Sequence, residues 1–243
     1  MDLLTTNDAV TRRIKAMNDR LSGLKENGLY FYNQAIEELL GDSKVRVRGR
    51  VMGMYASYSY LGLVGHPRIN EAAKKAVDQF GTGTNGVRSL AGSLTLHDEL
   101  EETIANFKHT EAAITYTSGY ATNLSVISTL MGRGDYVFSD KLNHASIVDG
   151  CLMSGAEFRR FRHNDMAHLE GLLKNAPPDV AKLVIADSVF SMDGDIIDLP
   201  KMLELCKRYN AWLMIDEAHS VGVLGEKGTG IEEYFGLGDV IDI

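Results

Sequence analysis

The segment AWLMIDEAHSVGVLG, residues 211–225, ends a short apolar run with a carboxylate, Asp216, and an imidazole, His219. A DEAH box that holds Mg²⁺ in an NTPase needs a phosphate loop ending in Gly-Lys-Ser/Thr, and the chain contains no Gly-Lys dipeptide. A zinc site needs a second histidine at helical spacing or a cysteine pair, and neither accompanies His219. The two residues therefore fit better the polar end of a central strand that faces a ligand.

Three further segments place polar residues after predicted strands. In TSGYATN (117–123), Ser118 and Gly119 stand at a helix start, where free backbone N–H groups and the helix dipole favour a phosphate. DKLNHAS (140–146) places His144 after a second strand, and DSVFSMDGD (187–195) places Asp187 and Ser191 after a third. A lone histidine is more often structural. A phosphate cradle, a carboxylate and two histidines at one sheet edge indicate a cofactor site.

Strand-like and helical patterns alternate from about residue 67 onward, which predicts an α/β architecture with a mostly parallel sheet. Ligands of such sheets bind beyond the carboxyl ends of the strands. We expect strands at 112–117, 135–139, 157–161, 182–187, 211–216 and 239–243. We expect helices at 67–80, 95–107, 119–131, 145–154, 165–175 and 199–210.

The first sixty residues have a different pattern. A polar helix is followed by VRVRGRVMGMYASYSYLGL, which predicts a small hairpin and a loop. We therefore expect an N-terminal segment over residues 1–60 and a large cofactor-binding domain over residues 61–243.

The segment GTGTNGVRSLAG (81–92) carries Gly81, Gly83 and Gly86 in the order of a dinucleotide fingerprint. That fingerprint needs a strand before it and a helix start immediately after it, whereas this segment follows a predicted helix and continues as loop. A dinucleotide site is therefore not favoured. The segment is also longer than a plain connection between two helices requires.

Composition excludes several classes of function. The chain has 243 residues, 44% hydrophobic and 24% charged, and a net charge of -8, which argues against a phosphate-backbone surface and hence against a nucleic-acid partner. Cys151 and Cys206 fall within predicted helices and form no metal-binding or disulfide pattern, so we expect a reducing, cytoplasmic setting. The N-terminus has no apolar run long enough for a signal peptide or a transmembrane segment.

Several motifs together resemble one family. SYLGL, GTGTNG, HDELEE, TSGYATN, HASIVDG, FRHND, FSMDGD and IDEAHS, with the glycines that follow, are similar to the α-oxoamine synthases, which depend on pyridoxal 5'-phosphate (PLP). The resemblance runs from about residue 25 to the end, and GTGTNGVR, HASIVDG and GLYFY are most similar to serine palmitoyltransferase. It implies the large domain of a fold-type-I PLP-dependent, aminotransferase-like transferase, with a mostly parallel seven-stranded sheet.

The resemblance also implies roles for individual residues. Asp216 would face the pyridine nitrogen of the cofactor, and His219 would hydrogen-bond its phenolic oxygen. His144 would stack on the cofactor and reach the substrate carboxylate. Asp187 and Ser191 would make further cofactor contacts. No metal site is expected.

The phosphate contacts implied by the resemblance are Ser118, Gly119 and Tyr120. Tyr58, in ASYSYLGL, stands where several members of the family have an asparagine that contacts the amino-acid substrate, so Tyr58 would take that substrate-binding position. The loop over residues 81–92 would lie at a homodimer interface and close the neighbouring active site.

The Schiff-base lysine of the family lies in a G-T-x-S-K segment after the strand that reads DVIDI here, and no lysine of this chain occupies that position. The C-terminal small domain and its substrate-binding arginine are also expected beyond Ile243. We interpret the chain as a piece of a longer polypeptide.

The implied reaction is the decarboxylative condensation of an amino acid with an acyl thioester of CoA or a carrier protein, giving an α-amino ketone. L-serine with a long-chain acyl-CoA is the leading substrate pair. The alternatives are another α-oxoamine synthase, of the 8-amino-7-oxononanoate synthase or 2-amino-3-ketobutyrate CoA ligase type, and a non-catalytic partner subunit of such a synthase. Such a subunit would be expected to lose cofactor contacts, yet Asp216, His219, His144 and Ser191 are present.

Overall fold

The computed structural model describes residues 8–41, 43–238 and 240–243. The chain divides into two compact units, Met1–His66 and Pro67–Ile243. Each unit is described by itself.

The first unit contains a helix and a small antiparallel sheet. Helix α1 (Ala9–Glu26) begins where the Asp8 carboxylate accepts hydrogen bonds from two backbone N–H groups of the first turn. Strands β1 (Glu38–Gly41), β2 (Lys44–Val47) and β3 (Arg50–Gly53) pair in the order β1-β2-β3, one strand more than the predicted hairpin. The β2–β3 turn is tight because Arg48 and Gly49 both take positive φ angles, as a two-residue hairpin requires.

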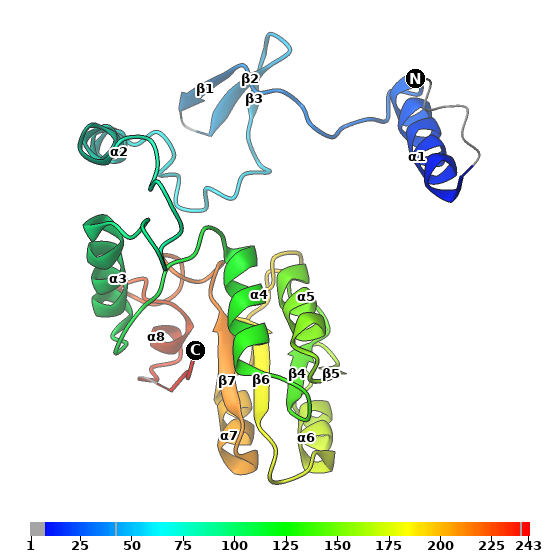
Figure 1. The fold of residues 1–243 in the computed structure, drawn as a ribbon, viewed down its shortest axis with the longest axis vertical. Coiled ribbons are helices and arrows are strands. Elements are labelled where there is room, and N and C mark those ends of the chain that lie inside the picture. The colour runs from blue at the N-terminus through cyan, green and yellow to red at the C-terminus, as the bar shows by residue number, and fades with distance from the viewer. Residues whose placement is uncertain (1–7, 42, 239) are drawn as a thin grey trace. The chain divides into compact units, whose positions relative to one another are not determined.

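The second unit is an α/β layer structure (Figure 1). Its four parallel strands run in the order β5-β4-β6-β7: β4 (Tyr136–Asp140), β5 (Glu157–Phe161), β6 (Lys182–Asp187) and β7 (Trp212–Asp216). Its helices are α2 (Pro67–Phe80), α3 (Thr95–Lys108), α4 (Gly119–Leu130), α5 (Ala145–Ser154), α6 (Met166–Asn175), α7 (Leu199–Tyr209) and α8 (Ile231–Tyr234).

Two hydrophobic cores lie on the two faces of this sheet. Along β6, Leu183 and Ile185 point into the core formed with α4 and α5, while Val184 and Ala186 point into the core formed with α6 and α7. This alternation follows from the two-residue period of a strand. Every residue of β6 is buried, as expected for a parallel strand covered on both faces.

Two of the six strands expected from the sequence pattern are absent from the sheet, which has four strands in the described residues, whereas the resemblance implied seven. Residues 112–117 form no strand, and the backbone N–H of Thr115 donates instead to the Glu101 carboxylate at 2.7 Å. Residues 240–243 also form no strand, although the backbone N–H of Ile215 in β7 donates to the backbone oxygen of Ile243 at 3.1 Å. Residue 239 lies outside the described residues. A strand requires a paired neighbour, which local sequence pattern cannot supply.

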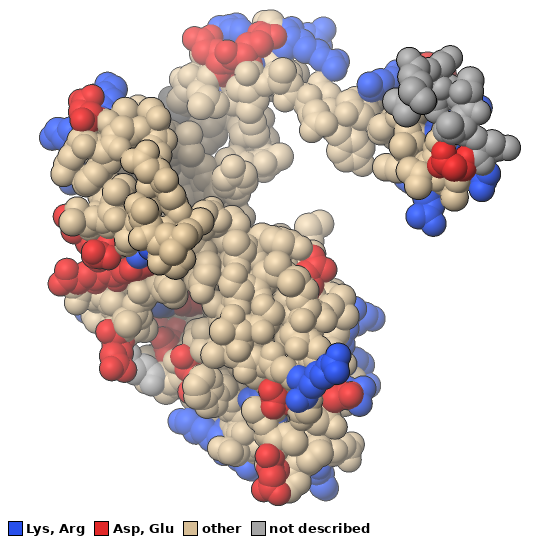
Figure 2. Space-filling view, viewed as in Figure 1, with Lys and Arg blue, Asp and Glu red and all other residues tan. Residues whose placement is uncertain are grey.

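Figure 2 shows mostly uncharged side chains over α4 and α5, whose only Asp, Glu, Lys or Arg residue is Asp149. In the part of the chain that the structure describes, no helix has the length and apolar character needed to cross a bilayer. Cys151 and Cys206 are free and buried in α5 and α7, and burial raises the pKa of each thiol to about 12.

Helices α4 and α5 pack closely because α5 presents a glycine at their contact. A methyl group added at Gly150 would lie 3.0 Å from the backbone oxygen of Asn123 and 3.0 Å from a side-chain carbon of Ile127. Both are on α4, whose N-terminus lies at the carboxyl edge of the sheet. Gly150 therefore sets the distance between two helices that begin at this edge.

We predict that Gly150→Ala lowers the stability of the protein by about 1–3 kcal/mol, because the helices must separate to admit the methyl group. Gly171→Ala in α6 is the matched control, since its methyl group would meet nothing within 4 Å. That control should be neutral or stabilising by up to about 1 kcal/mol through helix propensity. Thermal melting of both variants tests this, and equal melting temperatures would contradict the packing argument.

Candidate active site

Three parallel strands end in an aspartate at the same edge of the sheet. Asp140 ends β4, Asp187 ends β6 and Asp216 ends β7. Asp187 and Asp216 are register partners, so their side chains leave neighbouring strands at the same level. Asp140 and Asp187 are buried, at 0% and 2% exposed. The carboxyl edge thus concentrates negative charge, as the sequence pattern led us to expect of a ligand site.

Asp216 is held from two directions. Its Oδ2 accepts a hydrogen bond from Asn123 Nδ2 at 2.8 Å, and its Oδ1 accepts one from the backbone N–H of Ala218 at 3.0 Å. Asn123 lies one turn into α4 and is 5% exposed. Its amide also donates to Ser146 Oγ at 2.9 Å. The first turns of α4 and α5 therefore fix the orientation of this carboxylate.

His144 lies at the start of α5, directly against the second carboxylate. Its backbone N–H donates to Asp187 Oδ2 at 3.1 Å. Its ring Nδ1 accepts from the backbone N–H of Ser146 at 3.2 Å and lies 2.7 Å from Ser146 Oγ. The Nδ1 edge is thereby anchored to the helix cap. Ser146 joins His144 to Asn123, and so to Asp216.

The Asp187 carboxyl is strongly perturbed. Burial and, next, the charge of Asp216 raise its pKa to about 7, while the hydrogen bond from the backbone of His144 opposes the shift. Its backbone N–H donates to Asn143 Oδ1 at 3.0 Å, which fixes the end of β6. Two adjacent carboxylates of this kind favour a cationic ligand group that is delivered to the sheet edge.

The N-terminus of α4 provides an anion site at the same edge. Ser118 is the N-cap residue, and its Oγ accepts from the backbone N–H of Ala121 at 3.2 Å. Space is open beside Gly119, where an added methyl group would meet nothing within 4 Å. The Tyr120 hydroxyl donates to Asp149 Oδ2 at 2.5 Å, and that bond raises the pKa of Tyr120. First-turn N–H groups have no partners within the helix and suit a phosphate.

The remaining predicted residues lie on loops or in the other unit. Ser191 is exposed on the turn between β6 and α7, and His219 lies in the turn that follows β7. Tyr58 belongs to the first unit and is 88% exposed. Within the second unit, the structure thus gathers Asp187, Asp216, His144 and the α4 cap directly.

Sequence reasoning missed the polar residues that support the carboxylates: Asn123, Asn143, Ser146, Ser188 and Ser220. Ser188 Oγ bonds the backbone oxygen of Asp216 and Ser220 Oγ, each at 2.9 Å. Asn123 could have been found, since it follows the predicted phosphate cradle by one helical turn. Asn143 and Ser188 carry no local signal, because Asn143 bonds the end of β6 and Ser188 bonds the end of β7.

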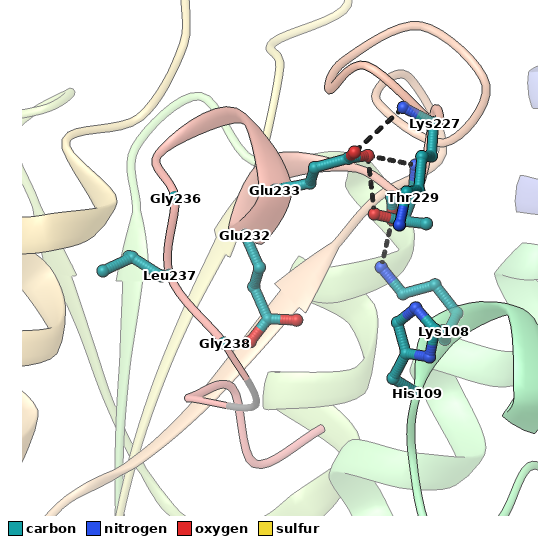
Figure 3. Close-up of a pocket in the computed structure, with 9 residues that line it drawn as sticks. All are labelled: Lys108, His109, Lys227, Thr229, Glu232, Glu233, Gly236, Leu237 and Gly238. Carbon is teal, nitrogen blue, oxygen red and sulfur yellow. Dashed lines mark hydrogen bonds between the residues drawn. The ribbon is translucent and has the colours of Figure 1, made fainter.

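Glu217, between Asp216 and Ala218, points into a different network. Its carboxylate pairs with Lys108 at the end of α3 and accepts from the backbone N–H of Ile231 at 2.7 Å. Lys108 also donates to the Thr229 backbone oxygen at 2.6 Å, beside a cavity of about 330 Å³ (Figure 3). The residues that line this cavity include none of the predicted site residues. Glu217 therefore ties the loop after β7 to the end of α3 and to the start of α8.

With this geometry in place, comparison with known proteins defines the family. The profile of "Aminotransferase class I and II" matches residues 54–242. The chain belongs to the aminotransferase class I and II family. It is 47% identical over 229 residues to 8-amino-7-oxononanoate synthase of Geobacter sulfurreducens, covering 94% of this chain and 58% of that protein. It is 44% identical to serine palmitoyltransferase of Sphingobacterium spiritivorum, covering 90% of this chain and 55% of that protein.

A solved serine palmitoyltransferase variant from S. paucimobilis, with bound PLP and myriocin, superposes with a TM-score of 0.93 at 37% identity, covering 97% of this chain and 61% of that chain. The predicted fold-type-I fold and the predicted resemblance to α-oxoamine synthases are confirmed. The chain spans a little under three fifths of the length of the curated relatives named above. The placement nearest to serine palmitoyltransferase stays a prediction, because the two identities, 47% and 44%, are close.

We predict that the cofactor-free protein loses stability as pH rises from about 4 to about 7. In the folded state the pKa of Asp187 is about 7, against 3.8 ordinarily, so the folded protein keeps this proton up to a higher pH than the unfolded chain does. Between these two pKa values the unfolded chain is favoured increasingly as pH rises, and the free energy of unfolding falls. Melting temperatures of full-length protein across this range measure the effect. Asp187→Asn should remove most of this fall in melting temperature with pH, whereas Asp179→Asn, at an exposed position, should leave it unchanged. A profile unchanged by Asp187→Asn would contradict the assignment.

Proposed function

We propose that the chain is the cofactor-binding part of a PLP-dependent α-oxoamine synthase, which condenses an amino acid with an acyl thioester and releases carbon dioxide. The observation that carries the proposal is the Asp187–Asp216 carboxylate pair beside the α4 N-terminus in a chain of this family. Relatives of the chain are such synthases, and solved serine palmitoyltransferases contain PLP.

The residues present fit the chemistry of this cofactor. A carboxylate beside the pyridine nitrogen favours its protonated form, and Asp216 is the carboxylate that Asn123 and Ala218 hold in a fixed orientation. The α4 cap, with Ser118, Gly119 and Tyr120, suits a phosphate dianion. PLP supplies an electron sink for the carbanion that forms at the amino-acid Cα.

The remaining side chains have positioning roles in the proposal. His144 orients the amino acid and covers the cofactor, its ring anchored through Ser146. Asp187 adds a second carboxyl group at the sheet edge, which is negatively charged above its pKa of about 7. Ser191 and His219 contribute further cofactor contacts from the turns after β6 and β7. In the proposal, the base that removes the Cα proton is the Schiff-base lysine that the resemblance to the family implies. A homodimer, closed by the loop over residues 81–92, completes the proposed site.

Two substrate pairs are in competition. The match to solved serine palmitoyltransferase favours L-serine with a long-chain acyl thioester. The match to 8-amino-7-oxononanoate synthase favours a second pair. The product, 8-amino-7-oxononanoate, has a chain of nine carbons. Alanine supplies two of them after loss of carbon dioxide, so the acyl thioester must supply a seven-carbon dicarboxylic chain. We propose serine with a long-chain acyl-CoA as the physiological pair, and alanine with the dicarboxylic thioester as the second candidate.

We predict that full-length protein, supplied with PLP, releases CoA fastest from palmitoyl-CoA with L-serine among the four combinations of L-serine or L-alanine with palmitoyl-CoA or pimeloyl-CoA. Thiol release and mass spectrometry of the α-amino ketone measure this. Preference for alanine with pimeloyl-CoA would overturn the serine assignment and retain the reaction class. Absence of all four products, together with tight PLP binding, would favour the non-catalytic subunit.

His144→Ala tests the positioning role. We predict that PLP still binds through the phosphate and ring-nitrogen contacts, while amino-acid affinity and condensation rate each fall by about tenfold or more, because orientation supplies much of the rate in such steps. Spectral titration with the amino acid and steady-state kinetics measure this. His168→Ala, on α6, is the matched control. A melting temperature lowered by His144→Ala, with normal amino-acid affinity, would reduce His144 to a structural residue.

A further inference from the structure

The turn that carries Ser191 is closed tightly at its base. Val189 and Ile196 form an antiparallel bridge, and the backbone N–H of Phe190 donates to the Asp195 oxygen at 3.1 Å. Gly194 donates to the Phe190 oxygen at 2.8 Å with a φ of 75°, a conformation that other residues rarely adopt. Ser191 therefore sits at the tip of a short, defined turn, with Phe190 and Asp195 on its two sides.

His163, from the segment after β5, contacts both sides of this turn. Its Nε2 lies 2.6 Å from Asp195 Oδ2, and its ring packs edge-on against Phe190 with the centroids 4.4 Å apart. Its Nδ1 lies 3.0 Å from Asp140 Oδ1, at the carboxyl end of β4. Phe190 is 1% exposed, so the contact between the His163 and Phe190 rings is buried. His163 thus ties the turn to the edge of the sheet.

This geometry favours the charged form of the ring. Both ring nitrogens face a carboxylate oxygen, and only an imidazolium can donate to both at once. Burial opposes the charge, but the hydrogen bonds to Asp140 and Asp195 prevail and raise the pKa of His163. The charged groups that face the ring among the described residues are these two carboxylates, and Phe190 forms its third neighbour.

The next residue reinforces the attachment. Asn164 donates from its backbone N–H to Asp140 Oδ2 at 2.8 Å and from its side chain to the Ile196 oxygen at 3.1 Å. Its Oδ1 accepts from the backbone N–H of Asp198 at 3.0 Å. The pair His163–Asn164 therefore holds the second half of the turn, while β6 holds the first half.

We propose that His163 is a positioning residue for the cofactor site: as an imidazolium it clamps Asp195 and Phe190 to Asp140, and so fixes the turn that presents Ser191. The inference rests on the proposed function, in which Ser191 contacts PLP. When the ring loses its proton, one of its two carboxylate bonds is lost and the turn loosens. Cofactor affinity then falls as pH rises through the titration of His163.

The test measures PLP binding to cofactor-free full-length protein by fluorescence between pH 6 and pH 9. We expect His163→Asn to bind PLP about tenfold more weakly than wild type at pH 6, the equivalent of losing one hydrogen bond to a charged group. The difference should shrink as pH rises through the titration of His163, because the wild-type ring then loses the charge that the variant lacks. The matched control, His168→Asn, should follow wild type, since the His168 ring bonds the backbone of Arg162 and not the turn.

Asp195→Asn provides a second variant, which retains the ring and removes the charge that favours the imidazolium. It should weaken PLP binding at pH 6 as His163→Asn does, and it decides the question if His163→Asn fails to fold. A lower melting temperature of the free protein, with wild-type PLP affinity at every pH, would overturn the inference and leave His163 a structural residue. Wild-type protein that binds no PLP at any pH would instead refute the proposed function.

Discussion

Two carboxylates at the ends of adjacent parallel strands are the constraint around which this site is built. Asp187 and Asp216 are register partners at the edge of a sheet buried on both faces, and their mutual repulsion is costly where water is scarce. Neutral donors reduce that cost: Asn123 and Ala218 donate to Asp216, and the backbone of His144 donates to Asp187. No lysine or arginine among the described residues pairs with either carboxylate. The arrangement thus retains negative charge for a ligand.

The fold supplies these donors through helix placement. Helices α4 and α5 begin at the same sheet edge. Their close contact at Gly150 brings Asn123 within hydrogen-bonding distance of both Ser146 and Asp216. The same helix start that provides Asn123 also provides the Ser118 cap. A single packing contact between two helices therefore controls both the carboxylate and the anion site, which are the two ends that an elongated ligand with a cationic ring and a phosphate would need.

Local pattern predicted most of the second unit. Helices α2 and α5 and strands β5 and β6 have the bounds expected from periodicity, because their patterns are long and their ends are marked by glycine, proline or a capping side chain. The prediction of a strand at 112–117 is wrong, because the backbone N–H of Thr115 bonds the Glu101 side chain and not a neighbouring strand. Strand pairing depends on distant residues, which a local pattern does not contain. Asp216, Asp187 and His144 were predictable as residues at strand ends. Asn143 and His163 were not, because their contacts join segments tens of residues apart.

The central claim is that Asp216 holds a protonated ring nitrogen. The most direct measurement is the ¹⁵N chemical shift of PLP labelled at its pyridine nitrogen and bound to full-length protein. The account predicts the shift of a protonated nitrogen in wild type at neutral pH, and the shift of an unprotonated nitrogen in Asp216→Asn. An unprotonated nitrogen in the wild-type protein, or one whose protonation is unaffected by Asp216→Asn, would contradict it.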